Sequence, residues 1–146
     1  MSAERMLSCH ESRGMIKLKK IILEACVDSV QSAIYAQEGG ADRLELCSNL
    51  LIGGVSPGKA LYNQVRKNTD IPVRVLLRPR YGDYCYDGYE FEQLKEEVQM
   101  YCEAGVDGIV IGLLRPDGNL DLERMKELIK IAGNKKKTLH RAFDVC

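Results

Sequence analysis

The sequence of 146 residues has no tryptophan, no excess of charge of either sign and no long apolar run. Lysine plus arginine and aspartate plus glutamate each number 21, which makes the formal net charge zero. Binding to a phosphate backbone depends on a clustered excess of basic residues, and a membrane-spanning helix needs about 20 apolar residues in a row. We therefore expect a globular domain that binds neither nucleic acid nor a membrane.

The six cysteines also lack a C-x-x-C pair, so their spacing matches neither a zinc ribbon nor a small disulfide-rich fold. Residues 1–20 mix acidic and basic side chains and contain no apolar run of about 7 to 15 residues, which argues against a secretory signal. We expect residues 1–20 to be a flexible polar tail, residues 21–146 to form one domain, and the protein to reside in the cytoplasm with free thiols.

Five short apolar segments alternate with segments of helical periodicity. The expected strands cover residues 21–26, 43–47, 71–78, 107–112 and 138–142, and the expected helices lie near residues 29–38, 59–67, 90–104 and 122–132. The strands begin about 22 to 34 residues apart, near the roughly 31 residues of one unit in a (β/α)8 barrel. The pattern predicts an α/β fold, a partial TIM (β/α)8 barrel of about four βα units plus a fifth strand. Residues 135–137, three lysines, are expected to form an exposed turn before that strand.

An internal echo supports the repeating unit. Residues 39–46 (GGADRLEL) resemble residues 104–111 (AGVDGIVI), at a separation of about two units. In each copy a helix is expected to end at a glycine, which tolerates the left-handed conformation, before the next strand begins. A doubly wound sheet would also alternate strands and helices, but no G-x-G-x-x-G follows the first strand.

Five strands do not close a barrel of eight. We expect such a sheet to keep two open edges and to expose an apolar inner face to water. The chain should then dimerise, aggregate or remain partly ordered. It could be a truncated product without independent activity, or a protein that works only after pairing with another half-barrel.

Charged residues interrupt strands that should be covered on both faces. Those of interest as ligand-binding residues are Glu24, Arg43, Glu45, Arg78, His140 and Arg141. One interpretation is an ion-pair network that fills the barrel mouth. The other is a site for a small anionic or sugar-like ligand, with Arg78 as the anion binder and Glu45 or His140 as the acid–base catalyst.

Two Glu-x-Cys pairs lie on neighbouring strands. Side-chain alternation places Glu24 and Cys26 on one face of the first strand, and Glu45 and Cys47 on one face of the second. If both pairs point inward in register, strands about 4.8 Å apart bring the two sulfurs within the span of one two-coordinate soft metal ion. The alternative is that each cysteine is a small buried apolar residue.

Five motifs, taken together and in order, carry a family resemblance. They are residues 24–30 (EACVDSV), 39–48 (GGADRLELCS), 78–83 (RPRYGD), 117–121 (DGNLD) and 140–144 (HRAFD). The chain resembles the CutC copper homeostasis family from about residue 21 to residue 146. That resemblance implies a (β/α)8 barrel and a cytoplasmic Cu(I)-binding protein of copper tolerance or trafficking whose members commonly form oligomers.

The resemblance also implies site residues. The family's two proposed copper-binding cysteines correspond to Cys26 and Cys47, and the ligand-binding residues named above are expected to line the barrel mouth. Copper homeostasis through Cu(I) held by these cysteines is the leading hypothesis. A barrel enzyme acting on a small anionic or sugar-like metabolite is the alternative from another class, so whether the protein is an enzyme stays open.

Overall fold

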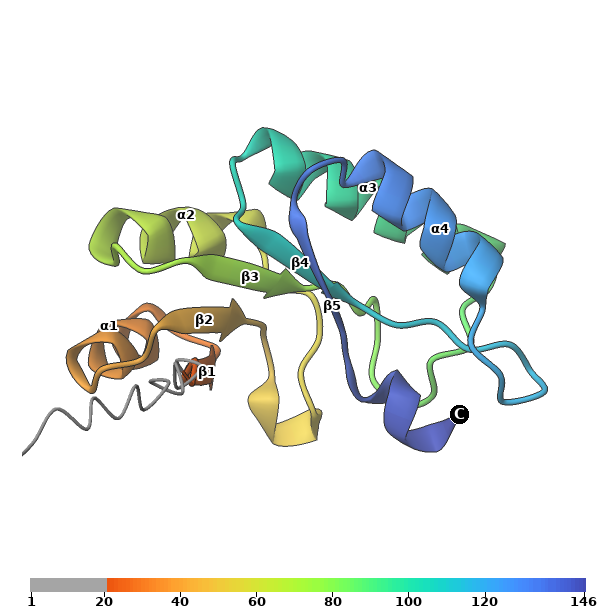
Figure 1. The fold of residues 1–146 in the computed structure, drawn as a ribbon, viewed down its shortest axis with the longest axis horizontal. Helices are drawn as coiled ribbons and strands as arrows, with labels where there is room; N and C mark the ends of the chain where they lie inside the picture. The colour runs from red at the N-terminus through yellow and green to blue at the C-terminus, as the bar shows by residue number, and fades with distance from the viewer. Residues whose placement is uncertain (1–20) are drawn as a thin grey trace, which may run out of the picture.

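The computed structural model describes residues 21–146, and the expected tail at residues 1–20 lies outside that part of the chain (Figure 1). The strands are β1 (Glu24–Val27), β2 (Arg43–Leu46), β3 (Val73–Leu76), β4 (Gly108–Ile111) and β5 (Lys136–Leu139). The helices are α1 (Val30–Glu38), α2 (Lys59–Asn68), α3 (Gly88–Glu103) and α4 (Leu122–Ile131), with two short 3-10 helices, η1 (Leu50–Ile52) and η2 (Arg141–Val145).

All neighbouring strands are parallel, and their order in the sheet is β1-β2-β3-β4-β5. Each strand thus pairs with the strand that follows it in the sequence, as in the wall of a (β/α)8 barrel, whereas a doubly wound sheet reverses its order at one point. Figure 1 shows α2, α3 and α4 along one side of the strands. The predicted α/β fold with parallel strands is confirmed.

Polar residues fix the starts of three helices. Ser29 caps α1 and Asp87 caps α3, each within a reciprocal capping box, and the side chain of Asp121 accepts a hydrogen bond from the Arg124 N–H at the start of α4. Such caps satisfy backbone N–H groups that have no partner within the helix. Residues close in the sequence therefore determine where these helices begin.

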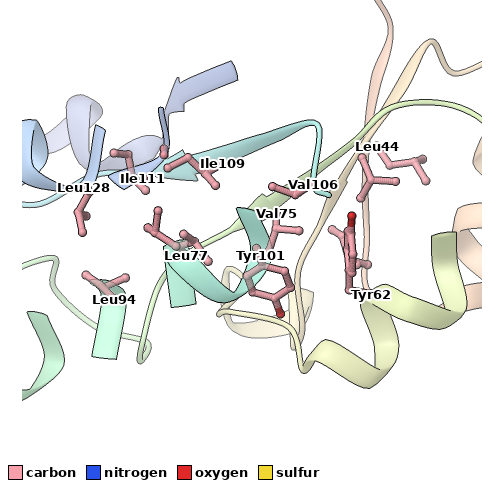
Figure 2. Close-up of a cluster of buried hydrophobic side chains, with 14 of the residues drawn as sticks. Leu44, Tyr62, Val75, Leu77, Leu94, Tyr101, Val106, Ile109, Ile111 and Leu128 are labelled. Carbon is pink, nitrogen blue, oxygen red and sulfur yellow. The ribbon is translucent and has the colours of Figure 1, made fainter. Parts of the chain in front are cut away.

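The main hydrophobic core lies between the sheet and the helices (Figure 2). Leu44, Val75 and Ile109 come from three successive strands, and Tyr62 and Tyr101 come from α2 and α3. The two tyrosine rings meet edge to face with centroids 5.5 Å apart. Side chains of this size each contribute about 1.5 to 3 kcal/mol when fully buried, so this layer carries most of the stability of the sheet.

The internal echo has one structural role in both copies. Gly40 and Gly105 have φ values of 89° and 82°, which turn the chain from a helix into the next strand. The aspartate two residues after each glycine accepts a backbone hydrogen bond from the segment of the preceding strand. Asp42 accepts from the Leu23 N–H at 2.9 Å, and Asp107 accepts from the Val73 N–H at 2.8 Å. Each aspartate thus sets the register between two strands.

The opposite face of the sheet is largely polar, which corrects the expectation of an apolar inner face. In register, Glu24 lies beside Arg43 on β1 and β2, and Arg74 and Lys136 flank Gly108 on β3 and β5. Among residues 21–146, one small buried apolar cluster, formed by Cys47, Leu76 and Val110, lies on this face. Exposure of the inner face to water therefore costs less than a purely apolar face would.

The fifth strand begins earlier than predicted. Lys136 and Lys137 belong to β5 and pair with Gly108 and Ile109, so the expected exposed turn is wrong for these two lysines. His140 lies one residue beyond the end of β5, outside the expected strand. β5 is the last strand of the described sheet, and an edge strand tolerates lysines because their stems pack on the sheet while their ammonium groups reach water.

Gly108 permits the close approach of β4 and β5, and replacing it should weaken that pairing. A Cβ at this position would lie 2.8 Å from the Lys136 carbonyl oxygen and 3.2 Å from Arg74 Cγ. We expect Gly108→Ala to lower the free energy of unfolding by about 1 to 3 kcal/mol, measured by urea denaturation. Gly88→Ala is the control, because a Cβ there meets nothing within 4 Å; an equal loss in both variants would contradict the prediction.

Candidate functional site

Two adjoining cavities lie where the strands end. One of about 240 Å³ is lined by Cys26, Glu45, Cys47, Leu50, Gly53, Gly54, Leu76, Arg78, Tyr84, His140 and Arg141. The other, of about 480 Å³, shares Cys26, Glu45, His140 and Arg141 with it. The structure thus brings together six of the eight candidate site residues around one region, which we call the carboxyl-end site.

Glu24 and Arg43 lie elsewhere. They are the first residues of β1 and β2, and their side chains form an ion pair with each other. Arg43 also lines a separate cavity of about 520 Å³ together with Arg74 and Lys136. Because parallel strands bring their starts to one end of the sheet and their finishes to the other, these two residues sit at the end opposite the expected barrel mouth.

Cys26 and Cys47 are staggered rather than directly opposite. Cys26 pairs in register with Glu45, and Cys47 follows two residues later, just past the end of β2. Strand spacing and rise per residue place their Cα atoms about 8 Å apart, beyond the usual reach of a disulfide. All five cysteines of the described chain are free thiols.

Both of these thiols hold their protons tightly. Burial raises the pKa of the Cys47 thiol to about 12, and the neighbouring charges of Cys26, Glu45 and Asp28 add to that effect. Cys26 is exposed, yet partial burial of its sulfur and the charge of Glu45 raise its thiol pKa as well. The Cys47 thiol points to the Val27 carbonyl oxygen at 3.5 Å. Any metal bound here must displace protons.

Glu45 is half-buried and makes no hydrogen bond or ion pair with any residue of the described chain. Burial raises the pKa of its carboxyl, while the charges of Arg74 and Arg43 lower it. The two arginines therefore offset the charge of Glu45 from the amino-end side of the sheet.

Arg78 is a buried cation without an acidic partner among residues 21–146. Its side chain is 6% exposed, and Nη1 donates to the carbonyl oxygens of Gly53 and Gly54 at 3.3 and 3.0 Å. Nη2 donates to the Gly82 carbonyl oxygen at 2.8 Å, and the guanidinium lies 4.8 Å from the centroid of the Tyr84 ring. Its Nε is buried without a hydrogen-bond partner.

His140 is a half-buried, neutral imidazole. Its Nδ1 accepts a hydrogen bond from the Ala142 N–H at 3.1 Å, so the ring proton resides on Nε2, which is buried without a partner. Burial, together with the charge of Arg78, lowers its pKa to about 4. The ring packs against Tyr84 at a centroid distance of 4.9 Å.

Sequence reasoning missed the turn that shapes this site. Gly53 and Gly54 have φ values of 90° and 82° and direct their carbonyl groups at Arg78. A Cβ on Gly54 would lie 2.9 Å from Leu76 Cδ2, so a larger residue here would have to displace the Leu76 side chain and adopt a φ that favours glycine. The Gly-Gly pair after the second strand was visible in the sequence, but its partner Arg78 lies 24 residues away.

The donor set limits the kind of metal the site can hold. Within residues 21–146 there is no group of three or more histidine, cysteine, aspartate or glutamate side chains placed to hold a metal ion. Two cysteines alone can serve a soft two-coordinate ion such as Cu(I), whereas zinc sites use at least three protein ligands.

Comparison with known proteins gives the same family as the sequence motifs. A family model described as the CutC family matches residues 21–146. The chain belongs to the CutC family. A CutC family protein of Serratia proteamaculans is 40% identical over 126 residues, which cover 86% of this chain and 50% of that protein. The chain thus spans about half the length of this curated relative.

Solved structures resemble the same fold. The structure of a copper homeostasis protein CutC from Streptococcus agalactiae matches with a TM-score of 0.78 and 29% identity, covering 86% of this chain and 61% of that one. A phosphonomutase from Burkholderia cenocepacia matches with a TM-score of 0.53 and 25% identity, covering 76% and 46%. Among the described helices of this CutC chain, none is long and apolar enough to cross a membrane.

The neutral state of the half-buried His140 predicts acid sensitivity. Its pKa is about 4 in the folded protein against an ordinary value of 6.5, so the unfolded chain binds the extra proton between these pH values. Stability should therefore fall as pH drops from 6.5 to 4, with a loss of up to about 3 kcal/mol from this group.

Urea denaturation at several pH values tests this, with His140→Asn as the comparison. Asparagine keeps an acceptor for the Ala142 N–H but does not titrate. The variant should lose less stability on acidification than the parent. Equal losses of stability on acidification in the variant and the parent would show that His140 does not contribute to the acid sensitivity.

Proposed function

We propose that this CutC chain takes part in copper homeostasis by binding one Cu(I) ion between the thiolates of Cys26 and Cys47. The observation that carries the proposal is that both cysteines line the same cavity at the carboxyl ends of adjacent strands. Cu(I) prefers thiolate ligands and accepts two of them. Their stagger disfavours a disulfide, which keeps both sulfurs available to a metal.

The surroundings of the thiols set the conditions for binding. Each thiol must lose its proton, and Glu45 raises the pKa of both. Arg78 and Arg141 line the same cavity and bring positive charge toward the pair. Metal binding is therefore expected to release up to two protons and to strengthen as pH rises.

Anaerobic Cu(I) titration against a competing chelator tests the proposal. We expect Cys26→Ser, Cys47→Ser and the double variant to lose high-affinity binding, whereas Cys102→Ser, a half-buried thiol on α3, should bind as the parent does. Affinity of the parent should rise with pH, by as much as about 100-fold per unit when two protons are released. Equal binding by the double variant and the parent would exclude these cysteines as the site.

A second candidate function is an enzyme acting on a small anionic or sugar-like metabolite. It is favoured by Glu45 and His140, which line both cavities of the carboxyl-end site, and by the buried cation of Arg78. A carboxyl with a raised pKa and a neutral imidazole are suited to proton transfer. The structural likeness to a phosphonomutase, whose name denotes a phosphorus-containing anion, is consistent with this candidate.

We also propose that the chain self-associates and acts in a reducing compartment such as the cytoplasm. Within the described sheet, β1 and β5 each pair on one side only, and an open strand edge favours pairing with another chain. Five free thiols are compatible with a reducing environment.

Sedimentation velocity of the 146-residue chain tests self-association. We expect species heavier than the 16.4 kDa monomer, in proportions that depend on protein concentration. A compact monomer that unfolds cooperatively at all concentrations would contradict this proposal.

A further inference from the structure

We propose that Arg78 and His140 form a binding site for an oxyanion, such as the phosphate, phosphonate or carboxylate group of a small molecule, at the carboxyl ends of β3 and β5. Both side chains line the cavity of about 240 Å³. The inference rests on the second candidate function and narrows its ligand to an anion that presents at least two acceptor oxygens.

The first argument is that Arg78 is a buried cation without an ion-pair partner in the described chain. A buried cation is costly unless an anion offsets it, and the three carbonyl groups around Arg78 supply hydrogen bonds but no charge. No acidic side chain of the described chain forms an ion pair with it. The nearby carboxylate of Asp83 is exposed and forms its ion pair with Arg80, although the charge of Arg78 also contributes to lowering the pKa of Asp83. Glu45 lines the same cavity, but within the described chain no ion pair joins its carboxylate to Arg78, whose Nη atoms bond to backbone carbonyl groups instead.

The second argument is the number of donors left over. A guanidinium has five N–H groups, and the three carbonyl oxygens of Gly53, Gly54 and Gly82 take three of them. One N–H on Nε and one on Nη2 remain. Two adjacent N–H groups on a guanidinium are the arrangement that binds two oxygens of a phosphate or carboxylate.

The third argument is that two unpartnered polar atoms belong to side chains that line this cavity. Among the described residues, the buried side-chain atoms without a hydrogen-bond partner are Arg78 Nε, His140 Nε2 and Tyr86 Oη. Arg78 and His140 both line this cavity, and His140 offers an N–H donor from Nε2. Tyr86 lines a separate cavity, where burial raises the pKa of its phenol and its interaction with Arg78 opposes that shift. Buried polar atoms in folded proteins are nearly always satisfied, so the free donors of Arg78 and His140 point to an acceptor supplied by a ligand.

Tyr84 keeps the two donors in place. Its ring lies beside the Arg78 guanidinium and also packs against the His140 imidazole. Gly112 underlies the imidazole, since a Cβ there would come within 2.6 Å of Nδ1. Arg78 and His140 are thus held before any ligand binds, which lowers the entropy cost of binding.

Orthophosphate is the first probe, applied to the 146-residue chain at pH 7 in thermal-shift and calorimetric titrations, with chloride at equal ionic strength as the salt control. We expect phosphate to stabilise the parent beyond chloride. Arg78→Lys and His140→Asn should each raise the dissociation constant for phosphate about tenfold or more, because each removes a hydrogen bond to a charged ligand. Arg66→Lys, which alters an arginine on α2 that contacts Asp107, should leave phosphate binding unchanged.

Arg78→Lys also loosens three carbonyl contacts and could fail to fold, in which case His140→Asn decides, since it keeps the cap on the Ala142 N–H. No response to phosphate or to acetate beyond chloride, or an equal response in His140→Asn and the parent, would overturn the inference. A stronger response to acetate than to phosphate would assign the site to carboxylates.

A neutral polyol, sorbitol, separates this inference from the function on which it rests. Failure of both anions together with a sorbitol response that Glu45→Gln removes would refute the oxyanion site and leave the second candidate function standing. Failure of the anions and of sorbitol would refute both.

Discussion

The register between β1 and β2 is the constraint on which the rest of the structure depends. Because Cys26 lies beside Glu45, every second residue of both strands faces the same side of the sheet, and the residues between them face the helices. A shift of one residue would turn Leu44 and Leu46 out of the core and bring charged side chains into it. The apolar layer under the helices and the polar inner face thus arise from one alignment, which Asp42 helps to hold at its start.

Charged side chains find different kinds of partner at the two ends of the inner face. At the amino end, Glu24 pairs with Arg43 on the neighbouring strand, and Arg74 on β3 hydrogen-bonds across β4 to Thr138 on β5, so these charged groups find partners within the sheet. At the carboxyl end, Arg78 is bound by backbone carbonyl groups and His140 keeps a free donor. Paired charges suit a structural role, whereas buried donors without acceptors suit a ligand, and this difference separates the candidate site from the rest of the polar face.

The sequence predicts the elements well because their signals are local. Apolar runs, the cap at Ser29 and the glycine that ends each repeat all act within a few residues of their position. The site depends on contacts between distant segments, which spacing alone does not reveal. Only the folded structure reveals that Arg78 contacts Gly53 and Gly54 and that His140 lies beyond the end of β5. Glu24 lies at the start of β1 rather than near its end because β1 begins three residues later than the expected strand of residues 21–26.

The copper proposal and the oxyanion proposal both require the site to stabilise added negative charge. Two thiolates around one Cu(I) ion would carry a net charge of −1, much as a carboxylate does. Glu45 opposes that charge, while Arg78 and Arg141, which line the same cavity, favour it. Arg78 lacks an acidic partner in the described chain, so added negative charge in this cavity is offset rather than repelled. The positive charge of Arg78 also adds to the effect of burial, which is the main reason that the pKa of His140 is lowered and the imidazole stays neutral.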